Sequence, residues 1–296
     1  VGRGSVFYTQ GKLSVIWEDK LQVPVAMFGM GNIIAGSFTT TYNASATPGM
    51  IRCFFADRDL DFELDFVEAK VPFASADNIA VTEVTLNGVT DRDVAQRECN
   101  LLAARQFFQS KNYSWKTDQE GFLAKRGDLV YISHDSCQFG YSGRVHRFIY
   151  DGENIVGLET QASLGKSRWI IVRLPNGEMR KLRCRVEHEK VYFLDKFQAS
   201  DAPFFILEKK RDAVNNESRF PNTVAEDYVF IADIKETPGK IVRISSVDVE
   251  EKNVFTYSSF DEDPALWAYE HGVIIPPTTA DDAIGSIEAS DAMAED

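Results

Sequence analysis

One strongly marked helix stands among many short β-rich segments, and this pattern constrains the fold more than any other feature of the chain. The helix is expected to begin at Thr90 or Asp91, because a side-chain oxygen there accepts a hydrogen bond from an unpaired N–H of the first turn. Lys111 and Asn112 favour its end, since a cation complements the helix dipole and Asn tolerates left-handed dihedrals. The bulky apolar side chains share one broad face, expected to pack on the sheet that follows: Val94, Leu101, Leu102, Phe107 and Phe108.

The segments around this helix have the composition of strands. Before it, LSVIW, MIRCFF and LDFELDFV are rich in β-branched and aromatic residues. In the last segment, Phe62, Leu64 and Phe66 alternate with acids, which is the period of a half-buried strand. After the helix, Asp-Gly at 151–152 and Asn-Gly at 176–177 predict tight hairpin turns between further strands. The fold class predicted is therefore mainly β (α+β), with one long helix.

The composition fits a folded chain of two or three domains. Of the 296 residues, 44% are hydrophobic and 12% are aromatic, which is enough to form real cores. No apolar run has the length of a membrane span, and the opening VGRGSVFYTQ lacks the pattern of a signal peptide. The four cysteines are far apart and give no metal-ligand spacing, so they are expected to be reduced and mostly buried.

The charge of the chain is unevenly distributed. The net charge is −13, and beyond Lys252 the chain has ten acidic residues and no Lys or Arg. Residues 163–211, by contrast, hold twelve Lys and Arg against six Asp and Glu. A chain that is acidic as a whole is a poor non-specific binder of nucleic acid. The basic block therefore needs an explanation of its own.

A basic face is expected on the segment MRKLRCRV, where charged and apolar residues alternate with the period of a strand. The residues of this possible partner-contact face, including two from the other strand of the hairpin, are Arg168, Arg173, Lys181, Arg183 and Arg185. Three interpretations stay open: an ordinary solvated face, a contact for an acidic protein, or a site for phosphates of nucleic acid or lipopolysaccharide. The segment lacks interleaved aromatic residues, which argues against a platform for single-stranded nucleic acid.

No motif in the chain predicts catalysis. Ser133, His134 and Asp135 are the residue types of an acyl-transfer triad, but neighbours on a strand point to opposite faces and cannot converge. Ser133 and Asp135 are instead expected to cap backbone groups where a strand turns into a loop. The acids of DRDLDFELD lack the glycine of a calcium loop and fit a solvated strand face better. No phosphate-binding loop, dinucleotide fingerprint or zinc-protease motif occurs, so no catalytic residue, cofactor, metal or small-molecule substrate is expected.

Three segments together resemble the hub region of the lambda-like tail tip attachment protein J, the host-specificity protein of siphophages and prophages. The first is MIRCFFADRDLDFELDFV, and the second is the helix followed by GDLV, SHD and GRV. The third is IVRISSVDVEEKNVFTYSSFDEDPALWAYEHG, in which Phe260 and Trp267 stand where the family more often has Tyr. The resemblance covers most of residues 40–275, and it rests on the order and spacing of these segments.

The resemblance implies a structural function. In the family, three copies form a hub of tail-tube-like β-barrel or sandwich domains, which closes the tail tube around the path of the tape-measure protein and the genome. The expected partners are therefore two further copies of this chain as a homotrimer, the distal tail and tip proteins, the tape-measure protein, and the genome DNA in the lumen. The protein would be assembled in the host cytoplasm and located at the tail tip of the virion, with no membrane contact by this region.

The domain limits expected from the segments and the resemblance divide the chain into four parts. Residues 1–75 would be part of one β hub domain, and residues 81–162 with 212–275 would form a tail-tube-like domain. Residues 163–211 would be an inserted basic β module, a small β-barrel, and residues 276–296 an acidic linker or tail. Two other functions stay open: a carbohydrate-binding or hydrolytic β protein, and a hub or spike component of a contractile injection or secretion system.

Overall fold

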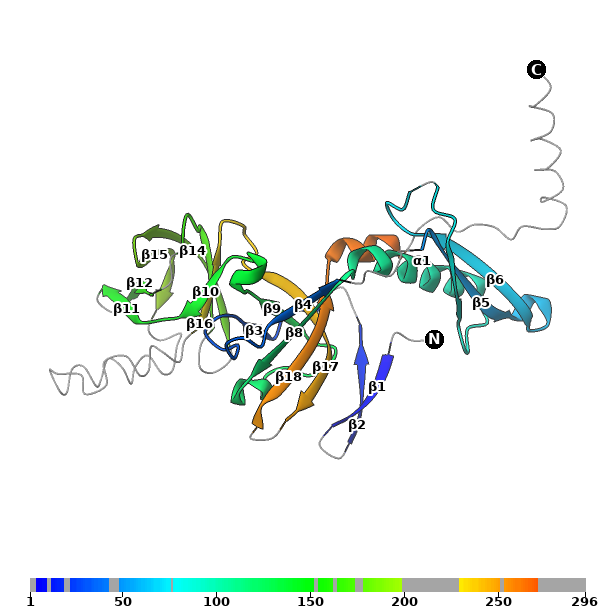
Figure 1. Cartoon of the computed structure of the whole chain (residues 1–296), viewed down its shortest axis with the longest axis horizontal. Helices are drawn as coiled ribbons and strands as arrows, with labels where there is room; N and C mark the ends of the chain where they lie inside the picture. The colour runs from blue at the N-terminus through cyan, green and yellow to red at the C-terminus, as the bar shows by residue number, and fades with distance from the viewer. Residues whose placement is uncertain are drawn as a thin grey trace, which may run out of the picture. The chain divides into compact units, whose positions relative to one another are not determined.

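The computed structural model of the chain is drawn in Figure 1 and describes residues 4–9, 12–18, 22–42, 48–75, 77–151, 154–161, 164–173, 178–198, 229–250 and 253–270. The predicted fold class, mainly β with one long helix, is confirmed. The chain divides into two compact units, of which the first is Ala44–Ser110 with Asp263–Asp296 and the second is Arg3–Asn43 with Lys111–Glu262. In the part of the chain that is described, no helix is long and apolar enough to cross a bilayer.

The first unit is a three-stranded sheet covered by the long helix. Its elements are β5 (Met50–Asp57), β6 (Glu63–Lys70), β7 (Val81–Thr85), α1 (Arg92–Phe108) and the short 3-10 helix η7 (Pro264–Tyr269). β5 is central, with β6 antiparallel and β7 parallel to it. Figure 1 shows α1 lying beside β5 and β6. The helix therefore packs on the sheet that precedes it in the chain, and the expectation that it packs on the following sheet was wrong.

Helix α1 begins where local chemistry predicted. The Asp91 side chain accepts hydrogen bonds from the backbone N–H of Asp93, at 3.0 Å, and of Val94, at 3.2 Å. The helix ends at Phe108, earlier than expected, because Lys111 already begins strand β8. The face toward the sheet consists of small residues one turn apart (Ala95, Cys99 and Ala103), while a second side buries Leu101 against Leu266 and Trp267 of η7.

Strand β6 has the predicted alternation but buries the opposite face. Its buried positions are Val67 and Ala69, which face α1, whereas Phe62, Leu64 and Phe66 are exposed. A period of two shows that one face is apolar, but it does not tell which face the helix covers. The Phe66 ring is partly covered by the Phe54 ring at 6.0 Å and by the guanidinium of Arg52 at 4.9 Å.

The second unit contains a six-stranded sheet with an aromatic core. Its strand order is β3-β9-β17-β18-β8-β4. The strands are β3 (Ala26–Phe28), β4 (Thr39–Tyr42), β8 (Lys111–Thr117), β9 (Leu129–Ile132), β17 (Lys240–Val249) and β18 (Phe255–Asp261). Phe28, Trp115 and Tyr257 pack together at the centre, with ring centroids 5.1–5.5 Å apart. The Tyr257 hydroxyl donates to backbone carbonyls at Gly121 and Ala124, so this large polar ring is satisfied inside the core.

A seven-stranded sheet completes most of the second unit. Its strand order is β10-β16-β13-β14-β15-β12-β11. The strands are β10 (Tyr141–Arg144), β11 (Arg147–Asp151), β12 (Asn154–Glu159), β13 (Trp169–Arg173), β14 (Met179–Glu187), β15 (Lys190–Gln198) and β16 (Val229–Asp233). The edge strands β10 and β11 are consecutive in the chain, so the sheet must curl back on itself, and its apolar side chains fill the interior. The pairings β11–β12 and β13–β14 confirm that these strands form hairpins, while the predicted turn residues Gly152, Asn176 and Gly177 lie outside the described residues.

The remaining strands, β1 (Gly4–Thr9) and β2 (Lys12–Trp17), form a sheet of two strands only. Ile16 of this hairpin is buried, and its side chain lies where a Cβ on Gly127 would stand, so Gly127 lets the hairpin approach the six-stranded sheet. Strands β13–β15, which come from residues 163–211, share one sheet with β10, β11, β12 and β16. The expected limits of whole domains stay a prediction.

Candidate functional site

The two large sheets of the second unit are joined by the segment that follows β3. Gly29 and Gly31 cross β10 so closely that a Cβ on Gly29 would lie 2.7 Å from the Ser142 side chain. The Ser142 hydroxyl accepts a hydrogen bond from the N–H of Met30 at 3.0 Å, and the Arg144 Nε donates to the Gly31 carbonyl at 2.6 Å. An apolar cluster of Met27, Ile171, Val229 and Ile231 fills the space between the sheets. The six- and seven-stranded sheets are therefore one packed body.

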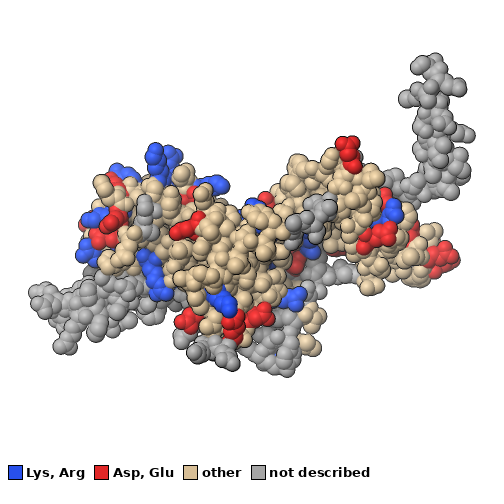
Figure 2. Space-filling view, viewed as in Figure 1, with Lys and Arg blue, Asp and Glu red and all other residues tan. Residues whose placement is uncertain are grey.

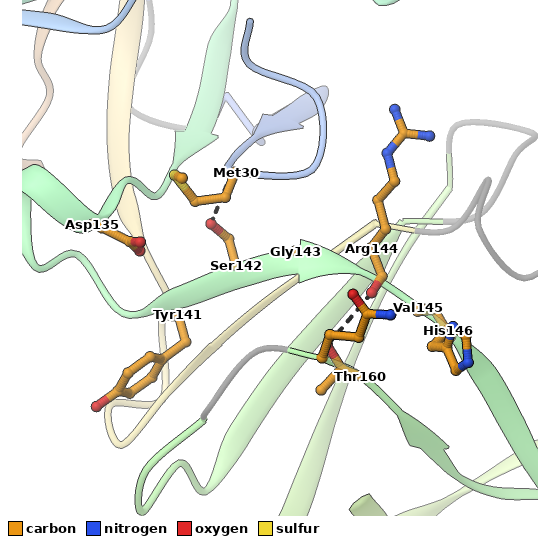
Figure 3. Close-up of a pocket in the computed structure, with 10 residues that line it drawn as sticks. Met30, Asp135, Tyr141, Ser142, Gly143, Arg144, Val145, His146 and Thr160 are labelled. Carbon is orange, nitrogen blue, oxygen red and sulfur yellow. Dashed lines mark hydrogen bonds between the residues drawn. The ribbon is translucent and has the colours of Figure 1, made fainter. Parts of the chain in front are cut away.

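A cleft of about 650 Å³ opens beside this junction (Figure 3). Its lining includes Met30, Asp135, Tyr141, Arg144 and His146. Figure 3 draws Asp135 and His146 at opposite ends of the cleft, so it brings no acid and base within reach of each other. An acid–base reaction needs such groups to converge on one substrate atom. The cleft has the dimensions of a small-molecule site, and among its described lining residues no acid and base are placed to act on one substrate atom.

The Ser133, His134 and Asp135 side chains do not form a triad. Ser133 is fully buried at the end of β9, whereas Asp135 is exposed. The His134 ring stacks on Phe38 at 4.3 Å, and its Nδ1 accepts from the backbone N–H of Ser136 at 3.2 Å. His134 therefore caps the turn, and the expectation that Ser133 and Asp135 would do so was wrong. Within the described residues, no group of three His, Cys, Asp or Glu side chains is arranged to hold a metal ion.

The predicted basic face lies on the curled sheet, where Lys and Arg side chains gather among acidic ones (Figure 2). Lys181, Arg183 and Arg185 of β14 are exposed, and Leu182 and Cys184 between them are buried, which confirms the predicted alternation. Arg168, next to β13, is exposed as well. The structure therefore brings four of the five predicted residues together on an accessible surface.

Arg173 is the exception, because it is buried. It lies on the same face of β13 as Ile171, and that face turns toward the six-stranded sheet at this point. Its guanidinium is therefore not part of the accessible basic face. From the sequence, Arg173 looks like one more surface cation, and its burial could not be predicted from the charge pattern.

Arg168, Arg183 and Arg185, but not Lys181, line a hollow of about 560 Å³, which we call the basic groove. Its polar and aromatic lining includes Lys166, Arg168, Trp169, Arg183 and Arg185. Its apolar lining includes Val186 and the exposed Leu194. Trp169 comes from the strand opposite Arg183. The aromatic residue that the sequence of β14 lacked is therefore supplied across the hairpin by β13.

Ion pairs inside the sheet neutralise part of this charge. Arg183 donates from Nη2 to the Asp195 carboxylate at 2.6 Å, and the Arg183 hydrogen bond lowers the pKa of Asp195. Arg185 pairs with Glu187 at 2.7 Å. Lys181 pairs with Glu236 at 3.0 Å, while its Nζ also lies 4.9 Å from the centre of the Trp169 ring.

Lys166 and Arg168 differ from these residues, because the described part of the chain supplies neither with an acidic partner. They are therefore the two groove cations whose charge is available to an incoming group. The sequence did not single out Lys166, since it precedes the strand and breaks the alternation.

A comparison with protein families finds one match, over just under half of the chain. Residues 3–148 match the family model described as "Phage-tail_3: Putative phage tail protein". This match supports the class of phage tail structural proteins, and with it a place in the tail of a virion. No curated protein matches the sequence.

Solved structures give distant matches. One is titled "Virion of native gene transfer agent (GTA) particle", with 13% identity, a TM-score of 0.39, and coverage of 82% of this chain and 33% of that one. Another is a tail protein from Neisseria meningitidis MC58, with 12% identity, a TM-score of 0.35, and coverage of 66% and 50%. A third is a prophage MuSo2 43 kDa tail protein from Shewanella oneidensis, with 13% identity, a TM-score of 0.28, and coverage of 52% and 44%. This chain thus spans between a third and a half of the length of the chains it matches.

Proposed function

We propose that this chain is a structural component of a phage tail tip or baseplate hub, in which three copies form a ring that closes the tail tube around the genome exit path. The observation that carries the proposal is the match of residues 3–148 to a phage tail family. The ring would contact the distal tail and tip proteins and the tape-measure protein, with the genome DNA in its lumen.

The β1–β2 hairpin supports an assembly of several copies. An isolated two-stranded sheet is at best marginally stable in water. One side of this hairpin carries exposed apolar residues at Val6, Leu13 and Val15, with exposures of 63%, 74% and 66%. Both strands also have an edge that the described residues leave without a neighbouring strand. A neighbouring copy that pairs with such an edge and covers the apolar side would satisfy the unpaired backbone groups and bury the exposed apolar side chains.

Other sheet edges in the chain offer similar pairing sites. β4 ends the six-stranded sheet, and its side chains are largely exposed. β7 ends the sheet of the first unit and is also largely exposed. In a closed ring each copy contributes one edge to the next copy, so edges of this kind are used without forming an open fibre.

For the basic groove we propose an acidic surface of an adjoining tail protein as the partner. Lys166 and Arg168 supply the unneutralised charge, and Trp169 and Leu194 supply an apolar area beside it. A polypeptide with acidic and apolar side chains complements both parts, whereas a phosphate backbone would use the charge alone. The sheet around the groove also carries Asp195 and Glu187, which would repel a polyanion.

The hub proposal can be tested by locating the chain in the particle. An antibody raised against the purified chain, applied to intact phage and viewed by negative-stain electron microscopy, should label the end of the tail distal to the head. Labelling of the head, or along the tail shaft, would contradict the proposal. Hydrolysis of host cell wall by the purified chain would instead favour the enzymatic alternative.

The groove proposal needs a separate experiment. Assembly of tails would be compared at low and moderate salt for Lys166→Gln/Arg168→Gln and for a control, Lys125→Gln/Arg126→Gln. The control removes two exposed cations of the loop that precedes β9. The groove variant should assemble less well at moderate salt, where charges still interact over roughly 8 Å, and the control should not. Equal assembly of both variants would show that the groove is only a solvated surface.

A further inference from the structure

Two of the four cysteines lie opposite each other inside the first unit. Cys53 is in the central strand β5 and Cys99 is in helix α1, and both side chains have 0% exposure. They belong to the same apolar cluster, which holds the helix on the sheet. Nothing in the proposed tail function uses them.

The geometry places the Cys99 thiol over the part of the sheet that carries Cys53. The Cys99 Sγ lies 3.4 Å from the carbonyl oxygen of Ile51 and 3.6 Å from that of Val67. Val67 is the residue directly across from Cys53 on β6, and Ile51 is two residues before Cys53 on β5. The Cys99 thiol therefore lies over the backbone next to Cys53. The Cys53 side chain is buried in the same cluster, between the sheet and the helix.

The residues around Cys99 on α1 explain why the helix comes so close. Ala95 and Ala103, one turn before and one turn after Cys99, are fully buried against the sheet. Small side chains at these positions let the helix axis approach the strand. A close approach is required for a disulfide, because the bond spans Cβ atoms only about 3.5–4.5 Å apart.

The thiols also influence each other's protonation. A hydrogen bond with Cys99 lowers the pKa of the Cys53 thiol. The same contact, together with burial, raises the pKa of Cys99. Cys53 is thus the member of the pair that more readily becomes the nucleophilic thiolate.

We propose that Cys53 and Cys99 are a latent disulfide pair, which stays reduced in the host cytoplasm and closes in an oxidising medium when unfolding or local opening of the first unit exposes both thiols. With a small disulfide such as oxidised glutathione as the oxidant, the Cys53 thiolate attacks one sulfur and releases a glutathione thiol. The Cys99 thiolate then displaces the second glutathione from Cys53. The two protons end on the two glutathione thiols, and the two electrons reduce the glutathione disulfide.

The bond would tie α1 to the centre of the sheet that it covers. It would close a loop between residues 53 and 99, which limits the unfolded state of the first unit. Virion surfaces are oxidising surroundings, whereas the cytoplasm keeps thiols reduced. That this chain passes from the cytoplasm to a virion surface rests on the proposed tail function. The ability of the two thiols to form a disulfide does not rest on it.

The test uses the isolated full chain. Reduced protein is refolded from urea in the presence of oxidised glutathione, so that both thiols pass through an accessible state before they are buried. Free thiols are then blocked, and the non-reduced tryptic digest is analysed by mass spectrometry. The expected product joins the peptides of residues 53–58 (CFFADR) and 98–105 (ECNLLAAR). The oxidised protein should also unfold at a midpoint higher by roughly 10 °C.

Cysteine variants give the controls. Cys184→Ala, which removes a buried thiol of the other unit, should leave the linked peptides unchanged. Cys53→Ala should abolish them and the rise in the midpoint. Free or separately glutathionylated Cys53 and Cys99 after refolding would overturn the proposal. No phage particle enters this experiment, so absence of the linked peptides would not contradict the proposed tail function. Conversely, evidence against the tail function would not contradict the formation of the disulfide.

Discussion

Arg243 offers the sharpest test of how the six-stranded sheet is held together. Its side chain is 1% exposed in β17, and it donates to both oxygens of the Glu262 carboxylate, from Nη2 at 2.9 Å and from Nε at 3.1 Å. Its Nη1 donates to the Gly127 carbonyl at 3.0 Å. Arg243→Ala would break this buried ion pair by removing the cation alone, which typically costs about 3–5 kcal/mol. The free energy of unfolding of a typical domain is about 5–15 kcal/mol, so the variant should be close to unfolding.

Urea denaturation followed by tryptophan fluorescence measures this loss, since Trp115 lies in the core of the same sheet. Arg147→Ala is the matched control, because Arg147 pairs with Glu159 on the surface, at an exposure of 60%, and such pairs contribute about 0–1 kcal/mol. The double variant Arg243→Met/Glu262→Met should recover much of the loss, because apolar replacements of a buried pair are often neutral. If Arg243→Ala lowers the free energy of unfolding no more than Arg147→Ala does, the buried Arg243–Glu262 pair does not stabilise the six-stranded sheet.

Three further predictions follow from the packing and the charges. Leu101→Asp should lower the free energy of unfolding by about 3 kcal/mol or more, because Leu101 is fully buried. Thermal melting should show a smaller decrease in stability for Leu102→Asp, because Leu102 is half-buried. Burial lowers the pKa of His134 below 6.5, so its contribution to stability is present above pH 6.5 and is lost as the pH falls toward the folded pKa; a proton NMR titration midpoint above 6.5 would refute this. Lys166→Gln/Arg168→Gln should leave the melting temperature within about 2 °C of the parent, because both side chains are exposed.

The start of α1 and the two hairpins could be predicted because each depends on neighbouring residues. The Asp91 cap needs only the N–H groups two and three residues further on. The end of the helix was placed too late, because residues from Lys111 onward pair with β18, which lies far along the chain. A long-range pairing of this kind competes with the local signals at a helix end and leaves no mark near it.

The faces of the strands were harder to predict than their existence. Alternation located β6 and β14, but the burial of Val67 in place of Phe66 depends on where α1 packs. Arg173 is likewise buried, although its charge and its place on β13 made it look like part of the exposed basic face. The contact between Cys53 and Cys99 follows from the same packing of α1 and has no signature in their spacing.

The symmetry of the assembled particle is the most direct test of the trimeric hub. Image averaging of tails that contain this chain should resolve three copies related by a three-fold axis at the tip, with strand β1 or β2 of one copy in contact with the next copy. In solution, the 33.3 kDa chain should correspondingly form a species of about 100 kDa at high concentration. Two copies related by a two-fold axis, or a chain that stays a monomer at high concentration and occupies a single position in the tail, would contradict a trimeric hub.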